Sequence, residues 1–249
     1  MVIAIASQKG GVGKTTTSIS LSAGLARRGK KVLLIDVDSQ ANSSKVLLPD
    51  YPQLKMDDTL YKTILEREAL RIHPTTVPNL DIVPAHILLS NTDIELTVAK
   101  DHREARLKKE LDQVKDRYEH VLIDCPPALS WLTINAFTAA DAAMVVVSPG
   151  YFELDSIVQI SKTIHEVKEF YNPNLQLLGL LFTMSDPTKN SEASIRTLRT
   201  AYPDMLLRTV IPKNTDIRDA HFSQKDIFDY APNSRSAEAY NRLIDELSL

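Results

Sequence analysis

A glycine-rich loop near the N-terminus carries the first residues with an evident chemistry. Three of the seven glycines in this 249-residue chain fall within residues 9–16. In such a loop between a strand and a helix, successive backbone N–H groups turn inward, and the positive end of the helix dipole adds to the field that attracts an anion. The expected phosphate contacts come from Gly10, Gly11, Val12, Gly13, Lys14, Thr15 and Thr16. Lys14 would reach the β- and γ-phosphates, and the Thr15 hydroxyl would bind Mg²⁺. The alternative interpretation of this segment is a flexible turn that binds no phosphate.

One position departs from the usual phosphate-loop motif. A glycine is expected five residues before Gly13, but the chain has Gln8 there, followed by a second lysine, Lys9. Because Lys14 already serves the phosphates, Lys9 has no obvious task in its own site. One resolution is that Lys9 reaches a nucleotide bound by a second copy of the chain and stabilises charge during phosphoryl transfer. A solvated loop lysine is the alternative.

Three aspartates stand at or just after the ends of apolar runs typical of strands. Asp36 and Asp38 follow one run, and Asp124 ends another. Ligands of doubly wound sheets bind beyond the carboxyl ends of the strands. We expect Asp124 to bind Mg²⁺ directly or through water, Asp36 to hold the outer shell of the metal, and Asp38 to orient the attacking water. Capping of a following helix or turn is the alternative.

Alternating strands and helices must position these groups. The predicted strands are residues 2–6, 31–36, 80–84, 120–124, 142–147, 175–182 and 205–211. The predicted helices are residues 15–28, 102–118, 154–170, 191–201 and 234–247. This order predicts a doubly wound, mostly parallel α/β sheet flanked by helices. No linker divides the chain, so residues 1–249 read as one domain. Five prolines interrupt residues 45–94, which we expect to form a peripheral insertion with little helix.

Composition excludes several classes of protein. The net charge is −3, and 43% of the residues are hydrophobic. A single cysteine, Cys125, excludes an intramolecular disulfide framework, and we expect it to be a buried, inert thiol. The N-terminus lacks the basic region of a signal peptide, and no apolar run approaches the length of a membrane span. We therefore expect a cytoplasmic protein.

These motifs together resemble the ParA/MinD family of P-loop ATPases with a deviant Walker A motif, and most of all the Soj-like ParA partition proteins. The resemblance rests on residues 9–16, 34–42, 121–127, 211–214 and 236–240, in the family's order. Ser39, Ala41 and Cys125 replace residues that are frequently Pro, Gly and Thr in the family.

The resemblance implies a mechanism. Two copies sandwich two ATP molecules with Mg²⁺, and each copy contributes its Lys9 to the other's phosphates. The ATP-bound dimer binds non-specific DNA on the nucleoid, and a ParB-like or cargo-adaptor partner stimulates an intrinsically weak hydrolysis. By position, Asp38 activates water, and Pro212 lies near the adenine, as do Thr183 and Met184 on weaker grounds. Pro126 and Pro127 stiffen a loop suited to sensing ATP against ADP.

DNA contact is expected from basic residues of the C-terminal third. The candidates are Arg196, Arg199, Arg218 and Lys225. Support from composition is modest, because residues 180–249 hold 9 Lys/Arg against 10 Asp/Glu. Weak phosphate contacts summed over a dimer can still hold a protein on DNA. His221 stands where proline is common in the family, within this same segment.

Other functions stay open at this point. A MinD-like protein needs a basic amphipathic C-terminal helix, whereas the tail carries Asp245 and Glu246 against Arg242. A relative of the nitrogenase iron protein needs two cysteines per subunit to hold a shared cluster, and this chain has one. A metabolic ATP-dependent enzyme needs a second substrate pocket that the sequence does not reveal, and a non-enzymatic scaffold would not depend on Asp38. The cargo (a plasmid, a chromosome or a protein organelle such as the carboxysome) is not encoded in any motif.

Overall fold

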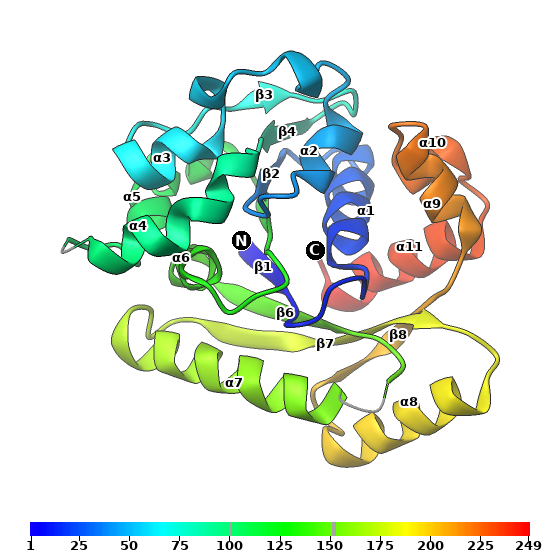
Figure 1. The fold of residues 1–249 in the computed structure, drawn as a ribbon. Coiled ribbons are helices and arrows are strands. Elements are labelled where there is room, and N and C mark those ends of the chain that lie inside the picture. The colour runs from blue at the N-terminus through cyan, green and yellow to red at the C-terminus, as the bar shows by residue number, and fades with distance from the viewer. Residues whose placement is uncertain (100, 151–152) are drawn as a thin grey trace.

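A computed structural model describes residues 1–99, 101–150 and 153–249 of the chain. Within these residues one eight-stranded sheet has the order β3-β4-β2-β5-β1-β6-β7-β8 (Figure 1). The strands are β1 Val2–Ala6, β2 Val32–Asp36, β3 His73–Pro74, β4 Leu80–Val83, β5 His120–Asp124, β6 Ala142–Val147, β7 Gln176–Ser185 and β8 Leu206–Pro212. All neighbouring strands pair in parallel except the two-residue edge strand β3, which is antiparallel to β4. The carboxyl ends of β1, β2 and β5 therefore meet at one edge of the sheet.

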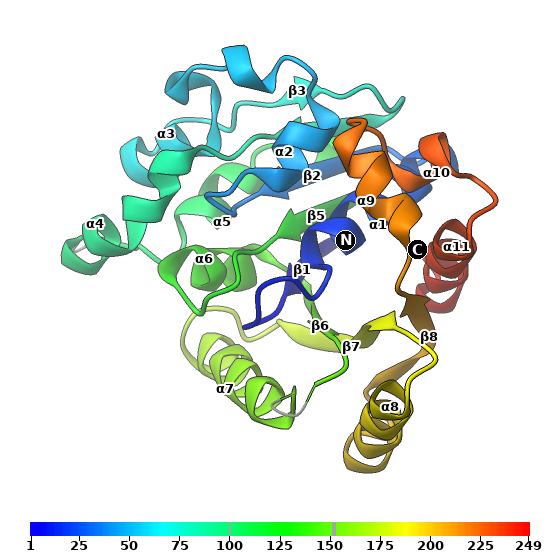
Figure 2. The ribbon, with the colours of Figure 1, turned by 45° about the vertical axis from the view of Figure 1, so that its right-hand side comes forward.

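Helices cover both faces of the sheet, as Figures 1 and 2 show. The side chains of Ile3 and Ile5 pack into one buried cluster and those of Ala4 and Ala6 into the other, because successive side chains of a strand point to opposite faces. The first face is covered by α1 Lys14–Arg27, α2 Asn42–Leu47, α10 Ile227–Tyr230 and α11 Arg235–Leu247. The second is covered by α3 Leu60–Glu66, α4 Thr92–Val98, α5 Arg106–Leu111, α6 Trp131–Ala139, α7 Glu153–Phe170 and α8 Lys189–Ala201.

The remaining helix, α9 Thr215–Phe222, follows β8 and lies beside α2 in Figure 2. Among the described residues, no helix combines the length and the hydrophobicity that crossing a bilayer requires.

The predicted architecture is confirmed. Strands β1, β5 and β6 have the predicted bounds, and the other predicted strands differ by one to three residues at an end. Helices α1, α7, α8 and α11 also lie where the sequence places them, within two residues. Ser234 caps α11, since its side chain accepts a hydrogen bond from the Ala237 N–H at 3.2 Å.

Two predictions about secondary structure were wrong. The helix expected over residues 102–118 is limited to α5, followed by a 3₁₀ turn at Lys115–Arg117. Helix α5 ends at Leu111, and the chain then runs to Tyr118, whose hydroxyl donates to Asp81 at 2.8 Å beside the start of β5. Residues 45–94 contain more helix than the prolines suggested, since α3 lies between Pro52 and Pro74 and the first three residues of α4 follow Pro84. The sequence prediction also missed α6, α9 and α10.

Candidate functional site

The loop between β1 and α1 has the backbone that an anion cradle needs. Gly11 and Gly13 have φ of 74° and 92°, a left-handed conformation that favours glycine. In the described part of the chain, the backbone N–H groups of residues 10–13 donate to no protein acceptor. Unpaired N–H groups ahead of a helix N-terminus form a phosphate site. The sequence prediction of a phosphate cradle therefore fits the geometry.

Lys14 crosses this loop and is only 6% exposed. Its Nζ donates a hydrogen bond to the Lys9 carbonyl at 2.9 Å. Burial lowers the pKa of Lys14, and the nearby carboxylates of Asp124 and Asp38 oppose that effect. A buried ammonium whose bond goes to a single backbone carbonyl is well placed to exchange that bond for phosphate oxygens. Lys9 itself is half-buried at the start of the loop, where its N–H donates to Ser7 Oγ at 3.3 Å.

Asp124 lies fully buried at the end of β5, behind the loop. Its two oxygens accept hydrogen bonds from Ser18 Oγ at 3.0 Å and from Ser43 Oγ at 2.7 Å. Burial raises the pKa of Asp124 to about 6, and hydrogen bonds from Ser43, Thr15 and Ser18 limit the rise. The contact with Thr15 joins two residues that the sequence assigns to the metal. Cys125, next in the chain, is buried as expected, and burial raises the pKa of its thiol.

The other two aspartates stand at the end of β2 and just beyond it. Asp36 is fully buried and is the register partner of Asp124. It accepts hydrogen bonds from Ser44 N at 2.9 Å and Ser44 Oγ at 2.7 Å, and burial followed by the charge of Asp124 raises its pKa well above the usual range. Asp38 is 7% exposed, and its Oδ1 accepts from the Gln40 N–H at 2.9 Å.

This donor set suits Mg²⁺ held jointly by protein and nucleotide. The described residues contain no group of three or more His, Cys, Asp or Glu side chains arranged as a complete metal cage. Mg²⁺ is usually bound by one or two carboxylates together with water and phosphate oxygens, so a complete cage is not needed. The Thr15 hydroxyl and the carboxylates of Asp124 and Asp36 are the oxygen donors beside the loop. A divalent cation there would also favour the ionised form of both buried acids.

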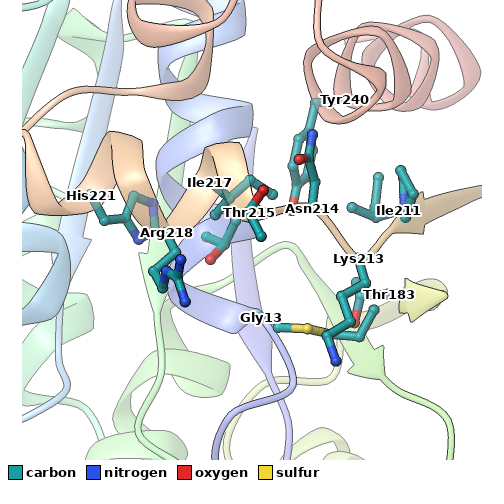
Figure 3. Close-up of a pocket in the computed structure, with 13 residues that line it drawn as sticks. Gly13, Thr183, Ile211, Lys213, Asn214, Thr215, Ile217, Arg218, His221 and Tyr240 are labelled. Carbon is teal, nitrogen blue, oxygen red and sulfur yellow. The ribbon is translucent and has the colours of Figure 1, made fainter. Parts of the chain in front are cut away.

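A pocket of about 370 Å³ opens beside Gly13, at the other end of the loop (Figure 3). Met184, Pro212 and Thr183 line it, as expected for the region around a nucleotide base. Thr183 is held in place, because its Oγ1 donates to the Val12 carbonyl at 2.5 Å and to the Val147 carbonyl at 3.1 Å. The pocket is therefore attached directly to the phosphate loop.

Several residues of this pocket were missed by the sequence prediction. They are Ile211, Lys213, Asn214, Thr215, Ile217, His221 and Tyr240, whereas Thr16, which also lines the pocket, was among the predicted nucleotide contacts. Asn214 caps α9, since its side chain accepts from the Asp216 N–H at 3.0 Å, and an Asn two residues before an Asp is a readable capping signal. Tyr240, which is fully buried, shares a hydrogen bond of 3.1 Å with Thr17 of α1. The motif around Tyr240 was recognised, but not its place in the pocket.

The four candidate DNA-binding residues do not form one group. Arg196 and Arg199 are exposed on α8. Arg218 lies on α9 at the pocket, 79% exposed, with its Nε 3.4 Å from Asp219. Lys225 follows α9 and lies 3.1 Å from Asp229. Two of the four candidates thus already have an acidic neighbour.

Comparisons with known proteins extend over the whole chain. Residues 1–177 match a family model described as an AAA domain. The chain is 40% identical to the sporulation initiation inhibitor protein Soj of Bacillus subtilis (strain 168), over 99% of this chain and 98% of the relative. It is 38% identical to the chromosome partitioning protein ParA of Caulobacter vibrioides (strain NA1000 / CB15N), over 99% of this chain and 93% of that protein.

Solved structures that are similar in both fold and sequence include one with a bound nucleotide. Cobyrinic acid a,c-diamide synthase from Mycobacterium smegmatis, with bound ADP and magnesium, matches with a TM-score of 0.84 and 30% identity. The match covers 98% of this chain and 92% of the other.

Proposed function

The chain belongs to the ParA/MinD family of P-loop ATPases, and on that premise we propose that it is a partition ATPase whose ATP-bound dimer binds non-specific DNA. A partner protein stimulates hydrolysis and so releases the dimer. The observation that carries this proposal is an intact phosphate loop with three strand-end aspartates, in a chain similar to Soj along its full length. ATP and Mg²⁺ are its ligands.

The protein's own groups bind the nucleotide and handle the proton. The N–H groups of residues 10–13 and the Lys14 ammonium bind the phosphates, for which Lys14 gives up its bond to the Lys9 carbonyl. Thr15 and Asp124 would hold Mg²⁺, with Asp36 in its outer shell, and the ion would supply positive charge that neutralises the phosphates. Asp38, which is buried just beyond the end of β2, orients the attacking water and accepts its proton.

Dimer formation supplies what one chain lacks. The loop contains no arginine, and Lys9 stands at its outer end, whereas Lys14 faces inward. We therefore assign Lys9 to the phosphates of the partner copy, where a cation stabilises the charge of phosphoryl transfer. Turnover by the isolated protein should accordingly be weak.

DNA binding is assigned to Arg196, Arg199, Arg218 and Lys225. Each contact to a DNA phosphate contributes little, so the affinity depends on the number of contacts and falls with salt. The acidic neighbours of Arg218 and Lys225 favour a dominant contribution from Arg196 and Arg199 on α8. With this assignment, the protein would act on the nucleoid in the cytoplasm. A ParB-like or adaptor partner would connect it to its cargo, which would be a plasmid, a chromosome or a protein organelle such as the carboxysome.

Two alternatives have specific observations to weigh. A metabolic ATP-dependent enzyme is favoured by the likeness to cobyrinic acid a,c-diamide synthase, at 30% identity against 40% for Soj. A MinD-like membrane role is disfavoured, since Tyr240, Leu243 and Ile244 of α11 are buried inside the protein. An apolar helix face that is already packed is not available to insert into a lipid surface.

Steady-state hydrolysis tests the enzymatic part of the proposal. The purified protein should turn ATP over slowly, with stimulation by DNA together with its partner. A matched reaction with Lys14→Ala measures the background from contaminating ATPases. Fast hydrolysis by the isolated protein would contradict partner control.

A further inference from the structure

Gln224, just after α9, has a backbone conformation that residues other than glycine rarely adopt. Its φ is 52°, in the left-handed region that favours glycine. Its N–H donates to the His221 carbonyl at 3.1 Å, which fixes the residue to the last turn of α9. A left-handed residue is common just after the end of a helix, so a role for Gln224 has to rest on what its side chain contacts.

The Gln224 side chain reaches a part of the chain 179 residues away. Its Nε2 donates a hydrogen bond to the Lys45 carbonyl in α2 at 3.0 Å. The Lys45 ammonium donates to the Gln40 carbonyl at 2.8 Å, and the Gln40 N–H donates to Asp38 Oδ1 at 2.9 Å. Three hydrogen bonds therefore lead from the end of α9 to the carboxylate of Asp38.

The loop that carries Asp38 is anchored on the sheet side, where Asp124 and Asp36 accept hydrogen bonds from Ser43 and Ser44 of α2. Helix α2 has six residues and begins after Ala41, whose side chain makes no cap and whose φ is 53°. Within the loop, the Ala41 N–H donates to the Asp38 carbonyl at 2.8 Å. A six-residue helix is too short to be stable on its own, so contacts from outside the segment, including the one from Gln224, influence where the loop lies.

The other end of the link is the pocket. Ile217, Arg218 and His221 of α9 line the wall of the base pocket, and Gln224 follows His221 by three residues. Figure 2 shows α9 beside α2, on the side of the molecule where the link runs. The same short helix thus contacts the base pocket and, through Gln224, the loop of Asp38.

We propose that Gln224 is a positioning residue for hydrolysis, which ties the wall of the nucleotide pocket to the loop of Asp38 through Lys45. The effect on turnover rests on the proposed role of Asp38, whereas the structural link does not. Gln224 lies outside the residues that line the pocket, so it positions the loop without contacting the nucleotide.

The variant Gln224→Gly distinguishes a role of the side chain from a role of the backbone conformation. Glycine suits a φ of 52° and removes the amide, so a purely local role predicts an unchanged or stabilised protein. Ser248→Gly is the matched control, because Ser248 has a φ of 54° at the end of α11, remote from this link. Gln224→Glu is the second variant, since a carboxylate keeps the length but cannot donate to a carbonyl.

Two measurements test the proposal. In nucleotide-free protein, hydrogen exchange of residues 38–47 should become several-fold faster in Gln224→Gly and Gln224→Glu, and should not change in Ser248→Gly. In steady-state hydrolysis, kcat should fall by about two- to tenfold while KM for ATP stays within about twofold.

The outcomes separate the two claims. Unchanged exchange in residues 38–47 would overturn the link, whatever the activity of the protein. Faster exchange with an unchanged kcat would overturn the positioning role. A wild-type protein without ATPase activity would instead contradict the proposed function, and the exchange data would still decide whether Gln224 holds the loop.

Discussion

In the nucleotide site that we propose, the phosphate end consists of one loop and three aspartates at or just beyond strand ends, whereas the base end is the pocket lined by residues of β7, β8, α9 and α11. Lys14, Asp36, Asp38 and Asp124 at the phosphate end are all less than 10% exposed. At the base end, Arg218 and Lys213 are exposed, and β8 is an edge strand. On this proposal, the chemistry depends on short segments beside the central strands, and base recognition depends on the packing of peripheral elements. Substitutions at the two ends should therefore differ in kind.

The largest effect is expected for Asp38→Ala. Turnover should fall by about a hundredfold or more, the range for loss of a general base, while ATP still binds. The variant should remain dimeric in saturating ATP and Mg²⁺, which size-exclusion chromatography with light scattering can measure. Asp50→Ala, an exposed aspartate beyond α2, is the control. A monomeric Asp38→Ala would contradict the assignment of Lys9 to the partner's nucleotide.

Lys14→Ala should abolish nucleotide binding in practice. The buried ammonium supplies charge-assisted hydrogen bonds to the phosphates, and its removal leaves Asp36, Asp38 and Asp124 facing them, so we expect affinity to fall by about a hundredfold. Isothermal titration with ATP and Mg²⁺ measures the change. Lys30→Ala, whose lysine pairs with Glu119 at 2.8 Å away from the site, should bind normally. Equal affinities would remove Lys14 from the phosphate site.

A substitution at the base end should act on affinity alone. Ile217→Ala removes three carbons from the pocket wall, and we expect the Kd for ATP to rise about three- to tenfold. The kcat at saturating ATP should not change, because Ile217 lines the pocket wall and takes no part in the hydrogen bonds that lead from Gln224 to Asp38. Val158→Ala, an exposed apolar residue on α7, is the control. A fall in kcat with an unchanged Kd would contradict the claim that the two ends of the site have different roles.

The smallest effect concerns the frame of the base end. Glu246 of α11 accepts hydrogen bonds from the N–H groups of Arg208 and Thr209 on β8, at 2.7 and 2.8 Å. Burial raises the pKa of Glu246, but the bonds from Thr209 and Arg208 outweigh it and lower the pKa below 4.5. A lowered carboxyl pKa stabilises the fold above the unfolded value, and this stabilisation is lost as pH falls through the folded pKa.

Glu246→Ala should therefore lower the free energy of unfolding by about 1 kcal/mol at pH 7. The difference from wild type should shrink as the pH falls below about 4.5. Urea unfolding at pH 7 and at lower pH measures both values. A difference that is constant with pH would mean that Glu246 contributes by packing rather than by its charge.

The phosphate end could be predicted from the sequence because its parts are local. The loop of residues 9–16 and the aspartates after apolar strands are each read within a few residues. The parallel strands β1, β5 and β6, buried on both faces, are predicted for the same reason, as continuous apolar runs.

The base end could not be predicted in the same way. Helices α9 and α10 have eight and four residues, too few to show an apolar period, although Asn214 and Asp226 cap them. The role of Tyr240 depends on the contact of α11 with α1, which joins residues 223 positions apart. Residues 102–118 failed for a different reason. Their composition favours helix, but α5 ends at Leu111, and Tyr118 beyond it bonds Asp81, which is distant in the sequence.

The most direct test of the proposed function is binding to non-specific DNA, measured with ATP, with ADP and without nucleotide at low and moderate salt. Fluorescence anisotropy of a labelled duplex gives the affinity in each state. The account predicts binding that requires ATP and weakens as salt increases. No binding in any nucleotide state would contradict it and transfer the weight to a metabolic, membrane or scaffold role within the same fold.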